Sequence, residues 1–374
     1  MNINNIRKTF KTTSIKEVIN HLGFQGLLKL ILVLLTSVCI ANTASASEKK
    51  TSFTIAWSIY AGWMPWGFAG DKGIVDKWAK KYGLQINIVQ VKDYVTSINK
   101  FTDGTYDGCV MTNMDAMSMP AAAGIDTTAL ILGDYSNGND AVVLKNATDI
   151  KEIKGRTVNL VEFSVSHYLL LRALEQNGLT ARDIKIQNVS DADVVPLMKK
   201  PSITAATLWN PQLSFILGQA ANIHKTFTSK EIPGEIIDML AVNTSVLKAN
   251  PDLGKALVGA WFETLQIMSK NDAEGKAART FMASNAGTSL ADYDSQLRDT
   301  QMFYTPEKSY EFSNNEKLKQ TMELVRSFAK EIGVKNADEI GVQFPDGSIQ
   351  GNSKSIKLRF DTHYVKLAMD RNLE

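Results

Sequence analysis

From residue 52 onward, the chain alternates segments of strand-like and helix-like hydrophobic pattern. Residues 84–91 (LQINIVQV) alternate apolar and polar side chains, whereas residues 73–83 (GIVDKWAKKYG) place apolar side chains at helical spacing and end in a glycine. The predicted strands are 52–57, 84–91, 106–112 and 126–133, and the predicted helices are 73–83, 94–104 and 113–124. This order predicts a mostly parallel sheet with helices on both faces.

The same order then repeats. The pattern predicts strands at 155–161, 184–189 and 203–209, and helices at 166–178 and 191–200. After a last strand-like segment at 239–243, the pattern is mainly helical, most clearly at 251–270 and 315–333. We expect an α/β fold with two lobes, because a chain of this length exceeds what one hydrophobic core usually supports.

The first 46 residues predict a secretory signal peptide that is not part of the fold. Five basic residues precede the apolar run of residues 30–41, and residues 44–46 (ASA) form a cleavage site of the A-x-A type. The apolar run is too short for a resident membrane span. We expect cleavage after Ala46 and a periplasmic mature protein. Cys39 offers a lipoprotein alternative, although a bulky residue precedes it. Only Cys109 remains after cleavage at Ala46, which excludes an internal disulfide.

Charge and motifs narrow the function classes. Removal of the signal peptide leaves 36 basic and 38 acidic side chains, because that segment contains five Lys and Arg and one Glu. Such a balance argues against nucleic acid or an anionic membrane as a partner. The sequence contains no G-x-S-x-G, Walker A, G-x-G-x-x-G, H-E-x-x-H or C-x-x-C motif, and its histidines are not spaced as metal ligands. We therefore expect a binding protein without enzyme activity, cofactor or metal.

Aromatic and acidic residues gather where the predicted strands end. The segment 57–66 (WSIYAGWMPW) follows the first strand and holds three of the six tryptophans. In open α/β sheets, ligands bind at the carboxyl ends of the strands. The candidate ligand-binding residues are Trp57, Trp63, Trp66, Asp115, Asp134, Glu162, His167, Trp209 and Asp238.

Several candidates also have a structural explanation. Trp57 ends a strand and fits a core position equally well. Asp115 lies near a helix start, where an acid interacts favourably with free backbone N–H groups. Asp134 and Asp140 bracket a Ser-Asn-Gly-Asn turn that favours such residues for backbone reasons, and we prefer Asp134 as the ligand contact. His167 is best explained as a first-turn histidine of a helix.

Together these features resemble the solute-binding proteins of ATP-binding-cassette importers of the nitrate/sulfonate/taurine type. The resemblance rests on residues 57–66, on 153–179 (IKGRTVNLVEFSVSHYLLLRALEQNGL), and on 205–214 (AATLWNPQLS) with 239–243 (MLAVN). It implies the bilobal periplasmic-binding-protein fold of type II, with two crossover segments. Lobe I would comprise residues 47–145 and 239–374, and lobe II residues 146–238. It further implies a monomer that binds a small-molecule ligand and delivers it to a permease in the inner membrane.

Within that group, residues 111–117 (MTNMDAM) and 134–140 (DYSNGND) resemble the subgroup associated with urea carboxylase, whose ligand is taken to be urea or guanidine. Anion-binding members surround their ligand with hydroxyl groups and helix N-termini, whereas Asp115 and Glu162 stand at the corresponding positions here. We therefore expect a small nitrogen-rich planar solute held between carboxylates and aromatic walls. The alternatives are an anion such as taurine, another sulfonate or nitrate, a pyrimidine precursor, or a sensing role with a receptor.

Overall fold

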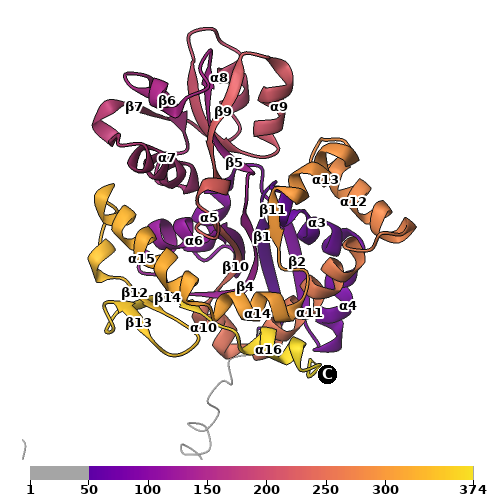
Figure 1. The fold of residues 1–374 in the computed structure, drawn as a ribbon. Coiled ribbons are helices and arrows are strands. Elements are labelled where there is room, and N and C mark those ends of the chain that lie inside the picture. The colour runs from indigo at the N-terminus through magenta and orange to yellow at the C-terminus, as the bar shows by residue number, and fades with distance from the viewer. Residues whose placement is uncertain (1–49, 374) are drawn as a thin grey trace, which may run out of the picture. The chain divides into compact units, whose positions relative to one another are not determined.

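The computed structural model describes residues 50–373 and contains two β-sheets flanked by helices (Figure 1). The larger sheet has nine strands in the order β13-β12-β14-β4-β10-β3-β1-β2, with β11 paired to β4. Its strands are β1 (Ser52–Trp57), β2 (Gln85–Gln90), β3 (Gly108–Thr112), β4 (Thr127–Ser136), β10 (Ile237–Asn243), β11 (Thr300–Met302), β12 (Gly341–Gln343), β13 (Ile349–Gly351) and β14 (Ile356–Phe360). The smaller sheet, in the order β7-β6-β8-β5-β9, consists of β5 (Asp140–Lys145), β6 (Thr157–Leu160), β7 (Lys185–Asn188), β8 (Ala205–Trp209) and β9 (Ile223–Thr228).

Helices connect these strands. Those before β5 are η1 (Ala61–Trp63), α3 (Met64–Asp71), α4 (Ile74–Lys81), α5 (Tyr94–Thr102), α6 (Asn113–Ala116) and the π-helical turn η2 (Met117–Ala121). Figure 1 shows α7 (Val165–Gln176), α8 (Val194–Met198) and α9 (Gln212–Gln219) gathered around the smaller sheet. The later helices are α10 (Thr244–Ala249), α11 (Pro251–Met268), α12 (Ala273–Asn285), α13 (Leu290–Arg298), α14 (Pro306–Ser313), α15 (Glu316–Glu331) and α16 (His363–Met369). Within the described part of the chain, no helix is long and apolar enough to cross a membrane. The predicted signal peptide lies outside the described residues.

The prediction of a mostly parallel sheet holds for most of the larger sheet, in which β10 is an antiparallel exception among the longer strands. β1 pairs in parallel with β2 and β3, as the βαβ order requires. β10, however, lies antiparallel between β3 and β4, because the chain re-enters this sheet from the smaller one and runs in the opposite direction. In the smaller sheet, β5 is likewise antiparallel to both β8 and β9. Strands that follow a crossover between sheets therefore break the parallel order.

Two crossover segments join the sheets and lie side by side. The first links β4 to β5 and the second links β9 to β10. The hydroxyl groups of Ser136 and Ser229 lie 2.7 Å apart, and the Gly138 N–H donates to Ser229 Oγ at 2.7 Å. Gly138 adopts a φ of 128°, a backbone conformation that favours glycine. These bonds hold the two crossovers together. They place the last residues of β4 and the first residues of β10 next to the start of β5.

The helices around this junction begin at capping side chains, which explains why they start where they do. At α5, Asp93 accepts a hydrogen bond from the Thr96 N–H at 2.6 Å. At α7, Ser164 accepts one from the Ser166 N–H at 3.1 Å. Such caps satisfy backbone donors that have no partner within the helix. They fix the start of α7, which faces the junction.

Candidate functional site

Four aspartates meet at the junction, and we call Asp115, Asp134, Asp140 and Asp238 the carboxyl cluster. Asp134 of β4 and Asp238 of β10 are direct partners in the antiparallel ladder. Asp140 is the first residue of β5, and Asp115 lies in α6. Each of the four residues is at most 2% exposed. Three of the four were candidates from the sequence, and the structure brings those three together.

Burial raises the pKa of every carboxyl in the cluster, because the charged form loses its hydration. The pKa of Asp115 rises to about 6, and those of Asp134 and Asp140 rise to about 7. The pKa of Asp238 lies well above its ordinary value because of burial and, next, the charges of Asp134 and Asp140. Asp115 adds to the shift at Asp140. Asp134, Asp140 and Asp238 therefore act on one another, Asp115 acts on Asp140, and burial with the neighbouring charges favours the protonated form of Asp238.

Within residues 50–373, no basic side chain forms an ion pair with the carboxyl cluster. Glu235 and Asp107 are buried acids that do have such partners, whereas Asp191 is buried beside Asp93 without one in the described part of the chain. Glu235 accepts hydrogen bonds from Arg172 at 2.9 Å and from the Tyr168 hydroxyl at 2.6 Å, and Asp107 pairs with Lys50 at 2.5 Å. Burying a carboxylate without a base costs several kcal/mol. The cluster therefore differs in kind from the acids that stabilise this fold.

Asp134 is the least satisfied member of the cluster. Neither of its oxygens accepts a hydrogen bond from an N–H or hydroxyl group of another described residue. Its carboxyl interacts with that of Asp238, its register partner, and this interaction lowers the pKa of Asp134 and raises that of Asp238. Gly62 lies against the same carboxyl, since a Cβ at that position would come within 2.5 Å of Asp134 Oδ2. A side chain at residue 62 would fill the space beside Asp134.

The carboxylate of Asp115, which extends from α6, lies at the start of α7. It accepts hydrogen bonds from the Thr112 hydroxyl at 2.6 Å and from the Tyr94 hydroxyl at 2.7 Å. The Val165 N–H, in the first turn of α7, also lowers the pKa of Asp115 against the effect of burial. The positive end of a helix attracts anions. Here the protein's own carboxylate already lies at that position.

Aromatic side chains border the carboxyl cluster. The Tyr60 hydroxyl is buried without a hydrogen-bond partner, and burial followed by the charges of Asp238 and Asp140 raises its pKa well above the ordinary value. The Trp63 indole N–H lowers the pKa of Asp238, although it forms no hydrogen bond of normal geometry. Trp63 packs on Tyr60 and Tyr94, with ring centroids 5.2 and 5.3 Å apart.

Trp209, at the end of β8, reaches the same group of rings. It meets Tyr94 edge-on, with ring centroids 5.7 Å apart. Trp209 is also the register partner of Asp140 in the β5–β8 ladder. The contact joins α5, which connects β2 and β3 of the larger sheet along the chain, to the smaller sheet. The Ser118 hydroxyl makes a second such contact by donating to the Phe163 carbonyl at 3.1 Å. The two sheets are thus in contact on both sides of the cluster.

The other two tryptophans of the 57–66 segment pack in the core. Trp57 is 3% exposed and lies against Gly67 of α3. Trp66 stacks on Trp261 of α11, with ring centroids 5.0 Å apart. Trp66 also borders a cavity of about 10 Å³ beside Asp134 and Asp238, a volume that a single water molecule would fill. The arrangement is a closed one in which the carboxyl cluster has little free space.

Glu162 and His167 do not join the cluster. Glu162 is half-buried after β6, and its backbone N–H donates to the Asn188 side chain at 2.9 Å. His167 is buried, and burial lowers its pKa to about 4, which keeps the ring neutral. The ring accepts a hydrogen bond from the Phe163 N–H at 3.3 Å and meets Phe328 edge-on. These contacts are those of a histidine packed in the fold.

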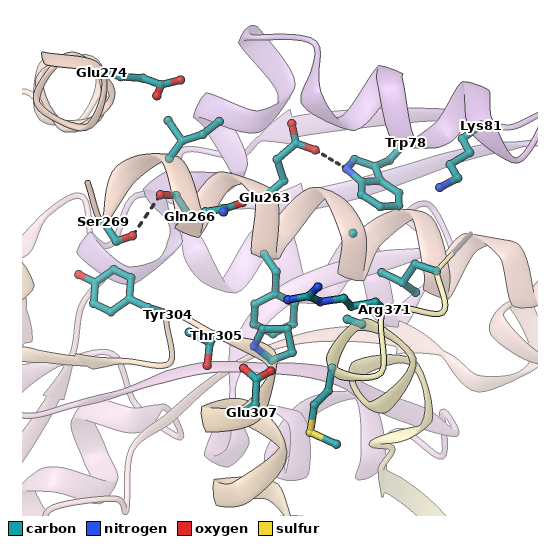
Figure 2. A pocket seen from close by; sticks show the side chains of 17 residues that line it. Trp78, Lys81, Glu263, Gln266, Ser269, Glu274, Tyr304, Thr305, Glu307 and Arg371 are labelled. Atoms are coloured by element: carbon teal, nitrogen blue, oxygen red, sulfur yellow. Dashed lines mark hydrogen bonds between the residues drawn. The ribbon is translucent and has the colours of Figure 1, made fainter. Parts of the chain in front are cut away.

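A larger groove lies elsewhere, with a volume of about 860 Å³ (Figure 2). It is bordered by α4, α11, the segment between β11 and α14, and the end of the chain. Figure 2 shows Trp78 donating to Glu263 across it, at 2.7 Å. Its lining includes none of the nine candidate residues and none of the carboxyl cluster. We therefore place the candidate site at the cluster.

Three residues of the site were absent from the nine candidates: Tyr60, Tyr94 and Asp140. Tyr60 lies within the same aromatic segment as Trp63, and Asp140 lies in the turn where Asp134 was preferred. Those two signals were therefore present in the sequence. Tyr94 begins a helix and carried no signal, because its role depends on the contact between α5, α6 and β8.

The sequence matches the NMT1-like family over residues 46–282. Among solved structures, the periplasmic aliphatic sulphonate binding protein SsuA from Escherichia coli shares 16% identity and a TM-score of 0.60, covering 75% of this chain and 87% of its own. The periplasmic nitrate-binding protein NrtA from Synechocystis PCC 6803 shares 14% identity and a TM-score of 0.54, covering 86% and 98%.

A Candida albicans protein described as having the generic periplasmic binding protein fold shares 17% identity and a TM-score of 0.55, covering 75% of this chain and 94% of its own. A comparison with curated proteins gave no significant match. At such identities these likenesses concern the fold alone, and they confirm the predicted α/β periplasmic-binding-protein fold. The family match and the fold also support the resemblance to solute-binding proteins of the nitrate/sulfonate/taurine type.

Proposed function

Since the chain belongs to the NMT1-like family, we propose that it is the solute-binding component of an ATP-driven importer. It captures a small nitrogen-rich solute of the guanidine or urea type and delivers it to a membrane permease. No bond of the solute is made or broken. The predicted export signal supports a periplasmic location, where a monomer meets the permease.

We further propose that each sheet is the core of one lobe. Lobe I consists of residues 47–145 and 239–374 and lobe II of residues 146–238, except that β5 joins lobe II and the first two residues of β10 join lobe I, because these segments pair in the smaller and the larger sheet respectively. The two crossovers, tied by Ser136 and Ser229, act as the hinge, and the lobes close over ligand as hinged domains do. Contacts between the sheets, such as that of Tyr94 with Trp209, support a closed arrangement.

The observation that carries the choice of ligand is the carboxyl cluster without a basic partner. A planar cation with several N–H donors would supply the missing positive charge and donate to the unsatisfied Asp134 oxygens. The rings of Tyr60 and Trp63 suit such a cation, since cation–π contacts contribute about 0.5–2 kcal/mol each. Within residues 50–373, no three acidic, His or Cys side chains converge as metal ligands do, which favours an organic cation over a metal ion. Guanidinium fits this description better than uncharged urea.

The second candidate is an anion, which the fold neighbours named as sulphonate-binding and nitrate-binding proteins favour. An anion would be drawn to the start of α7. Because Asp115 already lies there and its charge reaches the further carboxyl of Asp140, this candidate has less support.

A thermal-shift panel of guanidinium, urea, taurine, nitrate and thiamine precursors at pH 8 tests the proposal, because ligand binding raises the unfolding temperature by mass action. We expect guanidinium to give the largest shift. Its four heavy atoms, at about 1.5 kcal/mol each, correspond to a dissociation constant of order tens of micromolar. Urea should bind far more weakly. A larger shift with taurine or nitrate would contradict the proposal.

A further inference from the structure

The Asp134–Asp238 pair is built as a proton-sharing site. The two residues are register partners on neighbouring strands, and each is at most 2% exposed. Within residues 50–373, neither Asp134 oxygen has a hydrogen-bond partner, and the charge of Asp134 raises the pKa of Asp238. Two buried carboxylates on paired residues repel each other and cannot both ionise without a cation between them. The empty pair therefore keeps one proton.

Two further groups face this pair from other elements. Asp140, at the start of β5, raises the pKa of both Asp134 and Asp238 in addition to burial. Tyr60, just before η1, is 4% exposed, and its unpartnered hydroxyl is influenced by all three of these aspartates. A buried hydroxyl without a partner is rare in folded proteins and indicates a missing ligand or water. Asp140 and Tyr60 thus interact electrostatically with the same pair.

We propose that the carboxyl cluster takes up its cation in exchange for the proton shared by Asp134 and Asp238, with Asp140 and the Tyr60 hydroxyl as further ligand contacts. This inference rests on the proposed cation-binding function and adds its regulation. One proton leaves Asp238 for solvent as one cation enters, so the charge of the closed site is unchanged. The cation then donates its N–H groups to both carboxylates, and Tyr60 keeps its proton and donates it to the cluster.

The surrounding groups favour this exchange. The titratable side chains that interact with the pair are Asp140, Tyr60, Tyr293 and Tyr304, and Asp115 acts on Asp140; each of these groups is neutral or negative. None of them supplies the positive charge that would let Asp238 ionise in the empty site. The site therefore loads at neutral and alkaline pH and releases its cation as the pH falls.

Calorimetry with guanidinium chloride tests the exchange. Titrations at pH 6 and pH 8, each in phosphate and in Tris at constant ionic strength, report the number of protons released from the difference in heat between buffers. We expect about one proton released per guanidinium at pH 8, where the pair shares one proton, and more than one at pH 6, where Asp134 is protonated as well, so that the affinity falls at least tenfold for each pH unit below about 7. Urea, which has no charge, should release none.

Variants test the named residues. Asp134→Asn should release little or no proton and bind guanidinium at least tenfold more weakly. Asp140→Asn and Tyr60→Phe should also weaken binding. Asp76→Asn, the same substitution on the exposed surface of α4, should match the wild type. Carbon-13 NMR of the aspartate carboxyls adds a readout without ligand, and should show protonated signals at pH 7 that guanidinium removes.

The outcomes separate the two claims. Guanidinium binding with equal heats in both buffers and no pH dependence would overturn the exchange and leave the proposed function standing. The absence of guanidinium binding at any pH would overturn both. Wild-type binding by both Asp140→Asn and Tyr60→Phe would overturn their assignment as ligand contacts.

Discussion

Asp140→Asn should stabilise the ligand-free protein at pH 8, and do so much less at pH 5. Burial raises the pKa of this carboxyl from 3.8 to about 7. A raised pKa in the folded state means that stability is lost as the pH rises from about 4 through 7 and is constant above that. The loss is about 1.4 kcal/mol per pH unit and reaches about 4 kcal/mol at pH 8. Asparagine does not ionise, so the variant does not lose this stability as the pH rises.

The amide that replaces the carboxyl has its own cost. A buried N–H without an acceptor destabilises by about 1–3 kcal/mol, independently of pH. The net gain at pH 8 is therefore about 2 kcal/mol. Most of the pH-dependent part arises between pH 5 and pH 7, where the wild type loses about 3 kcal/mol more than the variant.

Thermal unfolding followed by circular dichroism at pH 5 and pH 8 measures this difference. Heat is the suitable denaturant, because urea and guanidinium salts are themselves candidate ligands. Asp76→Asn serves as the matched control, since it makes the same substitution at an exposed position of α4. Asp140→Asn should unfold a few degrees above the wild type at pH 8, and at or below it at pH 5. If it lowers the unfolding temperature equally at both pH values, then Asp140 is not an unpaired buried acid and the electrostatic reasoning fails.

Three further predictions concern other residues of the site and its surroundings. Asp115→Asn should weaken guanidinium binding at least tenfold, and Glu162→Gln less than threefold, because only the Asp115 carboxyl is fully buried beside α7. Calorimetry measures both affinities, and equal losses would contradict the prediction. Gly62→Ala should weaken binding at least tenfold, since its Cβ would lie 2.5 Å from a cluster oxygen, whereas Gly218→Ala, with open space around it, should bind as the wild type does. Arg172→Met should lower stability by about 3–5 kcal/mol in thermal unfolding by leaving a buried carboxylate without its base, and an unchanged unfolding temperature would refute that pairing.

The order of strands and helices could be predicted from sequence, because hydrophobic periodicity is a local property. The helix predicted at 73–83 is α4, and the strand predicted at 84–91 is β2. The direction of β10 could not be predicted, since it depends on how the chain returns from the smaller sheet. The strands β5, β9 and β11 to β14 were missed for a related reason, because their pairing joins segments that carry weak patterns.

The site was partly predictable for the same reason. An acid at the end of a predicted strand points to a binding edge, which placed Asp134 among the candidates, whereas Asp238 was chosen because it lies at the second crossover. That these two are register partners follows only from the pairing of β4 with β10, about a hundred residues apart in the chain. Glu162 illustrates the limit: it ends a predicted strand as Asp134 does, yet the turn after β6 leaves it half-buried and away from the cluster.

The central claim is that the carboxyl cluster binds a planar organic cation. A crystal structure of the protein grown at pH 8 with guanidinium chloride tests it most directly. The account predicts a flat guanidinium that donates hydrogen bonds to Asp134 and Asp238 and lies within contact of the Tyr60 and Trp63 rings. An unoccupied cluster at saturating guanidinium, or an anion bound at the start of α7 in its place, would contradict it.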